Sequence, residues 1–208
     1  MAWRRFDLQP GRARAPVLAL VLAPVLALLL SSASGRVLAQ TGAYTLDITH
    51  SFVTFEVLHA GISTTRGRFD RPQGSIALDR GARSASIEMQ IAIGSLRTGV
   101  PALDTLLMGA DYFDVATHPS ARWVADSQGF DGDMLKQLTG TLSLRGKTLP
   151  LTLTATRFNC YLNPLFRREV CGGDFEAQLK RSAWGIGPPS SWMADEVKLL
   201  IQVEAIKQ

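Results

Sequence analysis

The side chains best suited to acid–base or metal chemistry in this chain are three histidines, His50, His59 and His118. None of them lies in an H-x-H or H-E-x-x-H spacing, which would place two imidazoles on one face of a strand or helix. A nucleophile motif of the form G-x-S-x-G and a glycine-rich phosphate loop are also absent. The sequence therefore predicts no metal site, no cofactor and no enzymatic activity.

Two groups of charged residues are the next candidates. Asp104, Asp111 and Asp114 border a short predicted helix, where turn capping is the more frequent role of such a set than paired catalytic carboxylates. Arg66 and Arg68 alternate along a predicted strand. They could meet an anionic headgroup at the mouth of a barrel. The alternative is a solvated strand edge whose arginines discourage edge pairing.

The first 39 residues are typical of a secretory signal peptide. A basic segment over residues 1–14 precedes an uncharged apolar run over residues 15–30, and Val37-Leu38-Ala39 ends with small side chains at a cleavage position. The apolar run is short for a transmembrane helix, which needs about 20 residues. We expect export with removal of residues 1–39, and a retained membrane anchor is the alternative.

The charge balance changes once this segment is removed. The whole chain has 22 basic and 18 acidic residues, but the first 39 hold five of the basic and one of the acidic ones. Residues 40–208 therefore carry 17 of each sign and a formal net charge of zero. A neutral domain without a basic run gives no basis for nucleic-acid binding.

Residues 40–208 predict one all-β domain. Residues 44–48 and 52–59 alternate apolar and polar side chains, which is the pattern of half-buried strands, and Ser63–Thr65 is expected to be a polar bend. Pro101–Met108 is the one convincing helix, since proline suits a first turn and leucines recur at helical spacing. Further strands are predicted over residues 68–74, 75–79, 85–93, 121–126, 138–144, 149–158, 174–183 and 196–206. Eight to ten regularly spaced strands indicate a barrel or a sandwich.

The two cysteines, Cys160 and Cys171, both lie in the part of the chain expected to be exported. An oxidising compartment favours one disulfide, and two buried free thiols are the alternative. If residues 149–158 and 174–183 pair antiparallel, the cysteines face each other across the neck of a hairpin at bridging distance.

A series of short motifs resembles the YceI-like, polyisoprenoid-binding proteins, and the matches run in order along nearly the whole domain. They are Tyr44-x-Leu-Asp47-x-x-His50-Ser51, Phe55-x-Val57-x-His59-x-Gly61, Gly67-x-Phe69, Ser95-Leu96-x-Thr98-Gly99, Asp111-Tyr112-Phe113-Asp114-Val115, Gly140-x-Leu142-x-Leu144-x-Gly146-Lys147-Thr148-x-Pro150 and Arg181-Ser182-x-Trp184-Gly185. The segment that holds the two cysteines is an insertion relative to this pattern.

The resemblance implies an antiparallel lipocalin-like β-barrel of about eight strands with one short helix. It further implies a bacterial periplasmic protein that binds an isoprenoid lipid or a quinone-like tail in a long apolar cavity. A solid core built from the same residues is the alternative that composition alone favours. The expected cavity residues are Phe52, Phe55, Phe69, Ile76, Leu78, Ile87, Met89, Ile91, Leu142, Leu144, Leu151, Leu153 and Phe175, and the expected mouth residues are His50, His59, Arg66 and Arg68.

Three functions stay open at this point. The first is an exported carrier that sequesters or delivers an isoprenoid, without catalysis and with a role in stress as one context. The second is a redox accessory or enzyme that uses His50, His59 and Asp47 near the barrel mouth. The third is a module that contacts a membrane cytochrome or the membrane surface.

Overall fold

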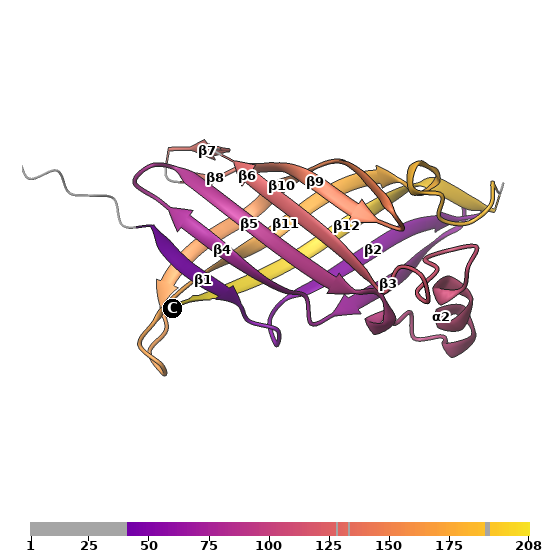
Figure 1. Cartoon of the computed structure of the whole chain (residues 1–208), viewed down its shortest axis with the longest axis horizontal. Coiled ribbons are helices and arrows are strands. Elements are labelled where there is room, and N and C mark those ends of the chain that lie inside the picture. Colours follow the sequence, from indigo (N-terminus) through magenta and orange to yellow (C-terminus); the bar gives the residue numbers. More distant parts are fainter. Residues whose placement is uncertain (1–40, 128, 133, 190–191) are drawn as a thin grey trace, which may run out of the picture. The chain divides into compact units, whose positions relative to one another are not determined.

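The computed structural model describes residues 41–127, 129–132, 134–189 and 192–208, so the predicted signal peptide lies outside the described residues. The described residues form strands, one α-helix and short 3-10 helices (Figure 1). The strands are β1 (Gly42–Leu46), β2 (Phe52–His59), β3 (Ser63–Asp70), β4 (Gln73–Asp79), β5 (Ser84–Ala92), β6 (Ser120–Ser127), β7 (Phe130–Asp131), β8 (Met134–Leu135), β9 (Gln137–Leu144), β10 (Lys147–Leu162), β11 (Glu169–Lys180) and β12 (Met193–Lys207). The helices are η2 (Ile93–Ser95), α2 (Pro101–Met108) and η3 (Arg181–Trp184).

Eight strands pair in a closed antiparallel ring, in the order β1-β4-β5-β6-β9-β10-β11-β12 and back to β1. The prediction of an antiparallel barrel of about eight strands with one short helix is confirmed, and the sandwich alternative is wrong. Closure through β1 and β12 leaves no free edge within this ring, whereas β3 lies at the end of the sheet order and keeps an outer edge. Each of these strands therefore turns one face to the barrel interior.

The long strand β12 extends the barrel wall at one end, because it pairs with two different strands along the same edge. The last part of β12 pairs with β1, whereas its first part pairs with β2. β3 continues the sheet beyond β2 and meets the segment after β5 through reciprocal backbone hydrogen bonds of 2.8 Å between Arg68 and Arg97. The β2–β3 hairpin thus forms the wall at the end of the barrel where α2 lies (Figure 1).

A buried serine holds the point at which β12 changes partner. Ser51 is fully buried, its hydroxyl donates to the carbonyl of Glu204 at 3.2 Å, and the Glu204 amide donates to the same hydroxyl at 3.1 Å. The Asp47 amide donates to the Glu204 carbonyl at 2.8 Å. These bonds satisfy backbone groups that the switch from β2 to β1 would otherwise leave unpaired.

The Cys160–Cys171 disulfide predicted from the sequence is present. The two residues are direct partners in the β10–β11 pairing, with 4.1 Å between their Cα atoms. Beyond them, β10 and β11 continue for two further paired residues before the turn at residues 163–168. The bridge therefore fastens the neck of a hairpin that projects at the end of the barrel away from α2 (Figure 1).

We expect the double substitution Cys160→Ser with Cys171→Ser to lower the free energy of unfolding by about 2–3 kcal/mol, because a cross-link that closes a short loop restricts the unfolded chain by about this amount. Urea unfolding of the variant and of the oxidised and reduced wild-type protein measures the effect. Reduced wild-type protein should match the variant, and equal midpoints for all three samples would contradict the assignment.

The turn between β1 and β2 holds the clearest histidine–carboxylate pair among the described residues. The Asp47 carboxylate lies 2.8 Å from Nδ1 of His50 and also accepts the Thr49 hydroxyl and amide. Burial disfavours the charged Asp47, but the hydrogen bonds from Thr49 and His50 outweigh it and lower the carboxyl pKa. The hydrogen bond to Asp47 and its negative charge raise the pKa of His50.

The two shifts predict opposite pH dependences. Because the folded pKa of His50 is raised, its contribution to stability is complete below the unfolded value of about 6.5 and is lost as the pH rises through the folded value. The contribution of Asp47 is lost instead as the pH falls through its lowered pKa. The pair is exposed, so the stability effect is small.

The measurable consequence is the titration midpoint of the His50 ring followed by NMR. We expect this midpoint above about 6.5 in the wild-type protein and a decrease on Asp47→Asn. Asp131→Asn, which removes a carboxylate from the separate β7–β8 hairpin, is the matched control and should leave the midpoint unchanged. A His50 midpoint that does not respond to Asp47→Asn would show that the pair does not form in solution.

Candidate functional site

The barrel interior is hollow at the end where α2 lies. A cavity of about 210 Å³ is lined by the inward faces of the strands, by α2, by the turn that follows α2 and by residues 181–188. On the same measure a single water needs about 10–15 Å³, and a smaller apolar cavity of about 150 Å³ stays dry and takes up apolar molecules. Val, Leu, Ile, Phe and Met side chains make up most of the lining. The interior is therefore suited to an apolar ligand rather than to water.

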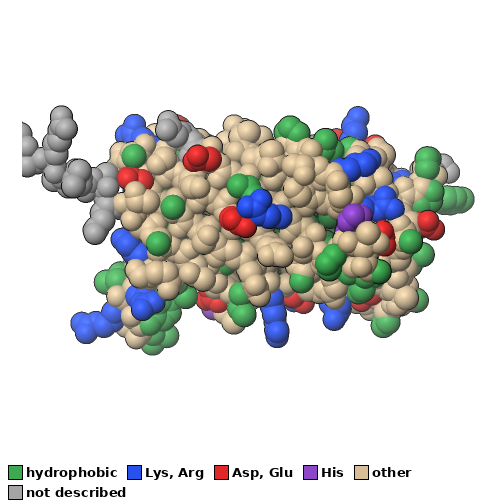
Figure 2. Space-filling model, viewed as in Figure 1, with side chains coloured by type: hydrophobic (Ala, Val, Ile, Leu, Met, Phe, Trp, Pro, Cys, Tyr) green, Lys and Arg blue, Asp and Glu red, His purple; other side chains and the backbone are tan. Residues whose placement is uncertain are grey.

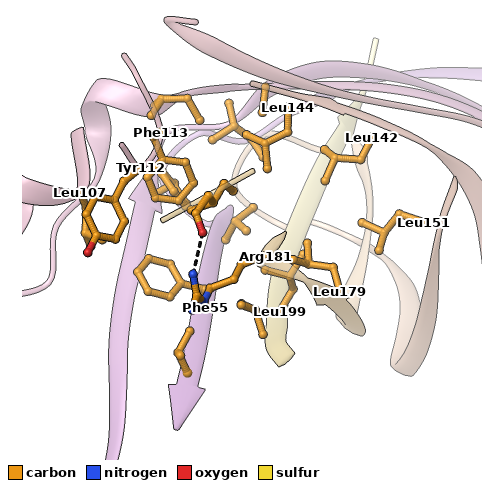
Figure 3. Close-up of a pocket in the computed structure, with 18 of the residues that line it drawn as sticks. Phe55, Leu107, Tyr112, Phe113, Leu142, Leu144, Leu151, Leu179, Arg181 and Leu199 are labelled. Atoms are coloured by element: carbon orange, nitrogen blue, oxygen red, sulfur yellow. Dashed lines mark hydrogen bonds between the residues drawn. The ribbon is translucent and has the colours of Figure 1, made fainter. Parts of the chain in front are cut away.

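Strand alternation positions this lining. On β2, Val53, Phe55 and Val57 are buried and line the cavity, whereas the residues between them are not buried. On β12, the buried Val197 and Ile201 and the partly buried Leu199 line the same cavity. Figure 3 shows leucines from several strands pointing into the space from around it. Period-two alternation in a closed sheet commits each such side chain to the interior.

One glycine makes room for an aromatic wall. A Cβ atom at Gly67 would lie 2.4 Å from the ring of Phe55, which is its direct partner on β2. The ring of Phe69 packs 6.0 Å from that of Phe55 and 5.5 Å from that of Phe113, edge to face with the latter. The Gly67-x-Phe69 motif thus lets three aromatic rings from β2, β3 and the turn after α2 line one side of the cavity.

The cavity opens where its lining changes from buried strand residues to half-exposed ones. Leu103 and Leu107 of α2, Tyr112 of the turn that follows it, and Pro188 and Met193 near the start of β12 lie at this end. Two segments therefore border the opening, the turn after α2 and the segment after η3. They meet there, because the Gly187 amide donates to the Asp111 carbonyl at 2.7 Å.

Arg181 is the one charged residue in the cavity lining that the structure describes. Its Nε donates to the carbonyl of Ala194 at 3.1 Å, and its Nη1 donates to those of Ile186 and Pro188 at 2.8 and 3.1 Å. Its Nη2 donates to the carbonyl of Met193 at 3.3 Å. Among the described residues, these bonds account for four of the five guanidinium N–H groups. Figure 3 shows the guanidinium at the side of the cavity.

A nearby carboxylate anchors the same corner. Asp195 accepts the Ser182 amide at 2.9 Å and the Ser182 hydroxyl at 2.7 Å. These hydrogen bonds lower the pKa of Asp195, and the positive charge of Arg181 adds to the effect. The hydrogen bonds of Arg181 and Asp195 therefore connect η3 to the first residues of β12. The segment between η3 and β12 is thereby held beside the opening.

A second, smaller cavity of about 50 Å³ lies deeper in the barrel. Its lining comes from the opposite halves of the same strands, such as Ile87 on β5, Phe175 on β11 and Val203 on β12. Tyr44 borders it, and the pKa of this phenol is raised by burial and by its hydrogen bond to Glu169. This end of the interior is as apolar as the first.

Twelve of the thirteen predicted cavity residues line one or both of these spaces. Main-cavity positions are Phe55, Phe69, Met89, Ile91, Leu142, Leu144, Leu151 and Leu153, and second-cavity positions are Ile76, Leu78, Ile87 and Phe175, with Met89 and Leu153 shared. Contact of these residues with a ligand stays a prediction. The alternative of a solid core does not hold for this part of the barrel, because the main cavity of about 210 Å³ is not filled by side chains.

The remaining predicted residues face outward. Phe52 alternates with the lining residues of β2, so its ring lies on the outer surface, where the Arg68 guanidinium sits 4.5 Å from the ring centre. Arg66 pairs with Glu56 at 2.6 Å and Arg68 with Asp70 at 2.7 Å, again on the outer face. The structure therefore does not place these arginines in a headgroup site, and the solvated-edge alternative describes them.

His50 and His59 do not meet. His50 precedes β2 and His59 ends it, so the length of the strand separates them. Neither lines the cavities. The described residues hold no cluster of three or more histidine, cysteine, aspartate or glutamate side chains arranged for a metal ion. None of the helices in the described part of the chain has the length and hydropathy required to span a bilayer.

Several residues that line the main cavity were not among the residues predicted from the sequence. Trp123 and the inward face of β12 carried the same alternation as the predicted set. Tyr112, Phe113 and Arg181 belonged to motifs that carried the family resemblance, but a motif does not say which of its residues point inward. The carbonyls that hold Arg181 come from residues 186–194, and no local sequence pattern indicates that contact.

Curated relatives cover most of the chain. A UPF0312 protein of Pseudomonas putida is 31% identical over 160 residues, which is 76% of this chain and 82% of the relative. Protein YceI of Salmonella paratyphi B is 31% identical over 160 residues, 76% of this chain and 83% of the relative.

Solved structures share the fold. BcnA of Burkholderia cenocepacia superposes with a TM-score of 0.59 at 23% identity, over 76% of this chain and 98% of that one. A polyisoprenoid binding domain from Saccharophagus degradans, implicated in plant cell wall breakdown, gives 0.58 at 18% identity, over 81% and 100%. Residues 44–205 match the YceI-like domain. The chain therefore belongs to the YceI-like domain family.

Proposed function

We propose that this protein is an exported binding protein that holds an isoprenoid lipid or a quinone-like apolar chain inside its barrel. The observation that carries the proposal is the unfilled apolar cavity of about 210 Å³, bordered at one end by half-exposed residues and containing one arginine. If the interior had no ligand to hold, we would expect side chains to fill this space, because an unfilled cavity lowers the stability of a protein.

The lining is suited to a methyl-branched chain. Leucine, isoleucine, valine and phenylalanine side chains present many small apolar contacts and almost no hydrogen-bond partners. Burying roughly 400 Å² of such a chain would contribute about 10 kcal/mol at about 25 cal/mol per Å². Lost translational and internal freedom of the ligand offsets much of this, which leaves affinities in the micromolar to nanomolar range.

The polar end of the ligand is assigned to the opening. The guanidinium of Arg181, the phenol of Tyr112 and the hydroxyl of Thr65 are polar side-chain groups of the described lining. A carbonyl, hydroxyl or phosphate oxygen would complete the guanidinium hydrogen bonds. A ligand with an apolar tail and an oxygen-bearing head would thus enter tail first.

The comparisons support this direction. The Saccharophagus degradans domain, which shares the fold, is described as polyisoprenoid binding, and this chain belongs to the YceI-like domain family. The predicted signal peptide supports export to the periplasm, where a carrier would keep an insoluble chain out of water. A role in stress and a contact with a membrane cytochrome stay predictions.

A binding role is favoured over the enzyme alternative by the positions of the histidines. The enzyme hypothesis needs His50, His59 and Asp47 near one opening, but the two histidines lie at opposite ends of β2. The cavity lining supplies no acid–base pair beside Arg181 among the described residues. Substrate turnover that depends on His50 would overturn the binding proposal.

The direct test is lipid extraction and native mass spectrometry of protein purified without detergent from its own host. We expect one prenyl-containing molecule per chain. Protein that carries no lipid, and that binds neither farnesol nor a short-chain quinone when they are added, would overturn the proposal.

A pair of neighbouring substitutions on β12 tests the cavity itself. We expect Leu199→Trp to lower farnesol affinity at least tenfold, because the larger ring projects into the main cavity and occupies the ligand space. Leu200→Trp adds the same ring on the alternate, outer face of the strand and should change affinity less than twofold. Titration by tryptophan fluorescence or calorimetry measures both, and equal losses would show that the ligand lies elsewhere.

A further inference from the structure

The two cavities are adjacent and share part of their walls. Met89, Trp123, Leu153 and Ile201 are the residues that line both. On β12 the main cavity is lined from Met193 to Ile201 and the second cavity from Ile201 to Ala205. The four shared residues therefore lie at one level of the barrel, as a partition between an outer and an inner space.

Trp123 is the bulkiest member of this partition and is held in place. Its side chain is 2% exposed, and its indole N–H donates to the backbone carbonyl of Leu151 at 3.2 Å. Met89 is its direct partner on β5 and is 5% exposed. A fixed indole beside a flexible thioether makes Trp123 the side chain that sets the depth of the main cavity.

We propose that Trp123 limits how much of an apolar chain the barrel buries, and that the second cavity is the unused inner end of the same site. This inference rests on the proposed function. A chain longer than the main cavity leaves its remaining units at the opening, in contact with water, so extra length adds little affinity. Removal of the indole joins the two spaces and lets a longer chain gain further buried surface.

The experiment compares farnesol with the longer geranylgeraniol. For the wild-type protein we expect affinities within threefold of each other. For Trp123→Leu we expect geranylgeraniol to bind about tenfold more tightly than farnesol, a difference of about 1.4 kcal/mol. Met89→Ala, which opens the other half of the partition, should shift the ratio in the same direction. Leu142→Ala is the control, because it enlarges the main cavity without joining the two.

The outcomes separate this inference from the proposed function. If both alcohols bind and their affinity ratio is the same in wild type, Trp123→Leu and Met89→Ala, the partition does not set length and the inference is wrong while the carrier proposal stands. If neither alcohol binds the wild-type protein, both fail. Thermal unfolding of each variant confirms that the ratio is measured on folded protein.

A second, independent feature is the tip of the β10–β11 hairpin, which the disulfide fastens at the opposite end of the barrel. Its large apolar side chains are exposed: Leu162 by 69%, Leu165 by 90%, and Tyr161 and Phe166 by nearly half. Two hydrogen bonds close the turn: the Leu165 amide donates to the Asn163 side chain at 2.9 Å, and the Asn163 amide donates to the Arg168 carbonyl at 2.9 Å.

Cations surround these apolar side chains. Arg167 and Arg168 are exposed in the turn itself, and within the described part of the chain neither forms an ion pair. Arg157 and Lys207 lie near the base of the hairpin beside Asp174 and Glu169. Hydrophobic and basic side chains are seen together on this projection at the lower left of Figure 2. Exposed aromatic and aliphatic tips flanked by arginines are suited to the interface of an anionic bilayer.

We infer that this hairpin docks the protein on an anionic lipid bilayer. Sedimentation with vesicles of phosphatidylcholine alone, or mixed with phosphatidylglycerol, tests it. We expect binding to the mixed vesicles only, with an affinity at least fivefold lower for Leu165→Ser with Phe166→Ser and for Arg167→Gln with Arg168→Gln. Ile62→Ser removes an equally exposed apolar residue from the β2–β3 turn and should bind as the wild type does. Background binding of the wild-type protein, as expected if the tip serves a protein partner, would overturn the inference.

Discussion

The hollow interior depends on how β12 closes the barrel. This strand pairs with β11 along its length and divides its other edge between β2 and β1, with Ser51 and Glu204 at the changeover. Because the ring is closed, its diameter is set by the number and tilt of strands and not by the size of the inward side chains. An eight-stranded ring of this kind can remain partly unfilled while every backbone group in it is paired.

This constraint explains why the fold could be predicted and the cavity only in part. Alternation identified the strands, and Pro101 and the leucines identified α2 with its correct bounds. The prediction of a bend at Ser63–Thr65 was wrong, because these residues pair with Val57–His59 in the β2–β3 hairpin. These residues lie in the exposed part of β3, where polar side chains are compatible with a strand. A short polar sequence in such a strand therefore looks the same as a turn.

The mouth was the least predictable part. The sequence prediction assigned it to His50, His59, Arg66 and Arg68, but on a strand the choice of inward face depends on a register that composition does not show. Phe52 and Phe55 are both aromatic and only three positions apart, yet one lies outside under Arg68 and the other inside. The charge that does line the cavity, Arg181, depends on carbonyls from a distant loop and on the turn that η3 makes.

The placement of charge also separates the roles of the arginines. Arg66, Arg68 and Arg122 each pair with a carboxylate on the outer surface, where such pairs contribute little to stability. Arg181 instead donates to four neutral backbone carbonyls beside an apolar space. The barrel thus combines a largely apolar interior with one charged side chain in the described lining.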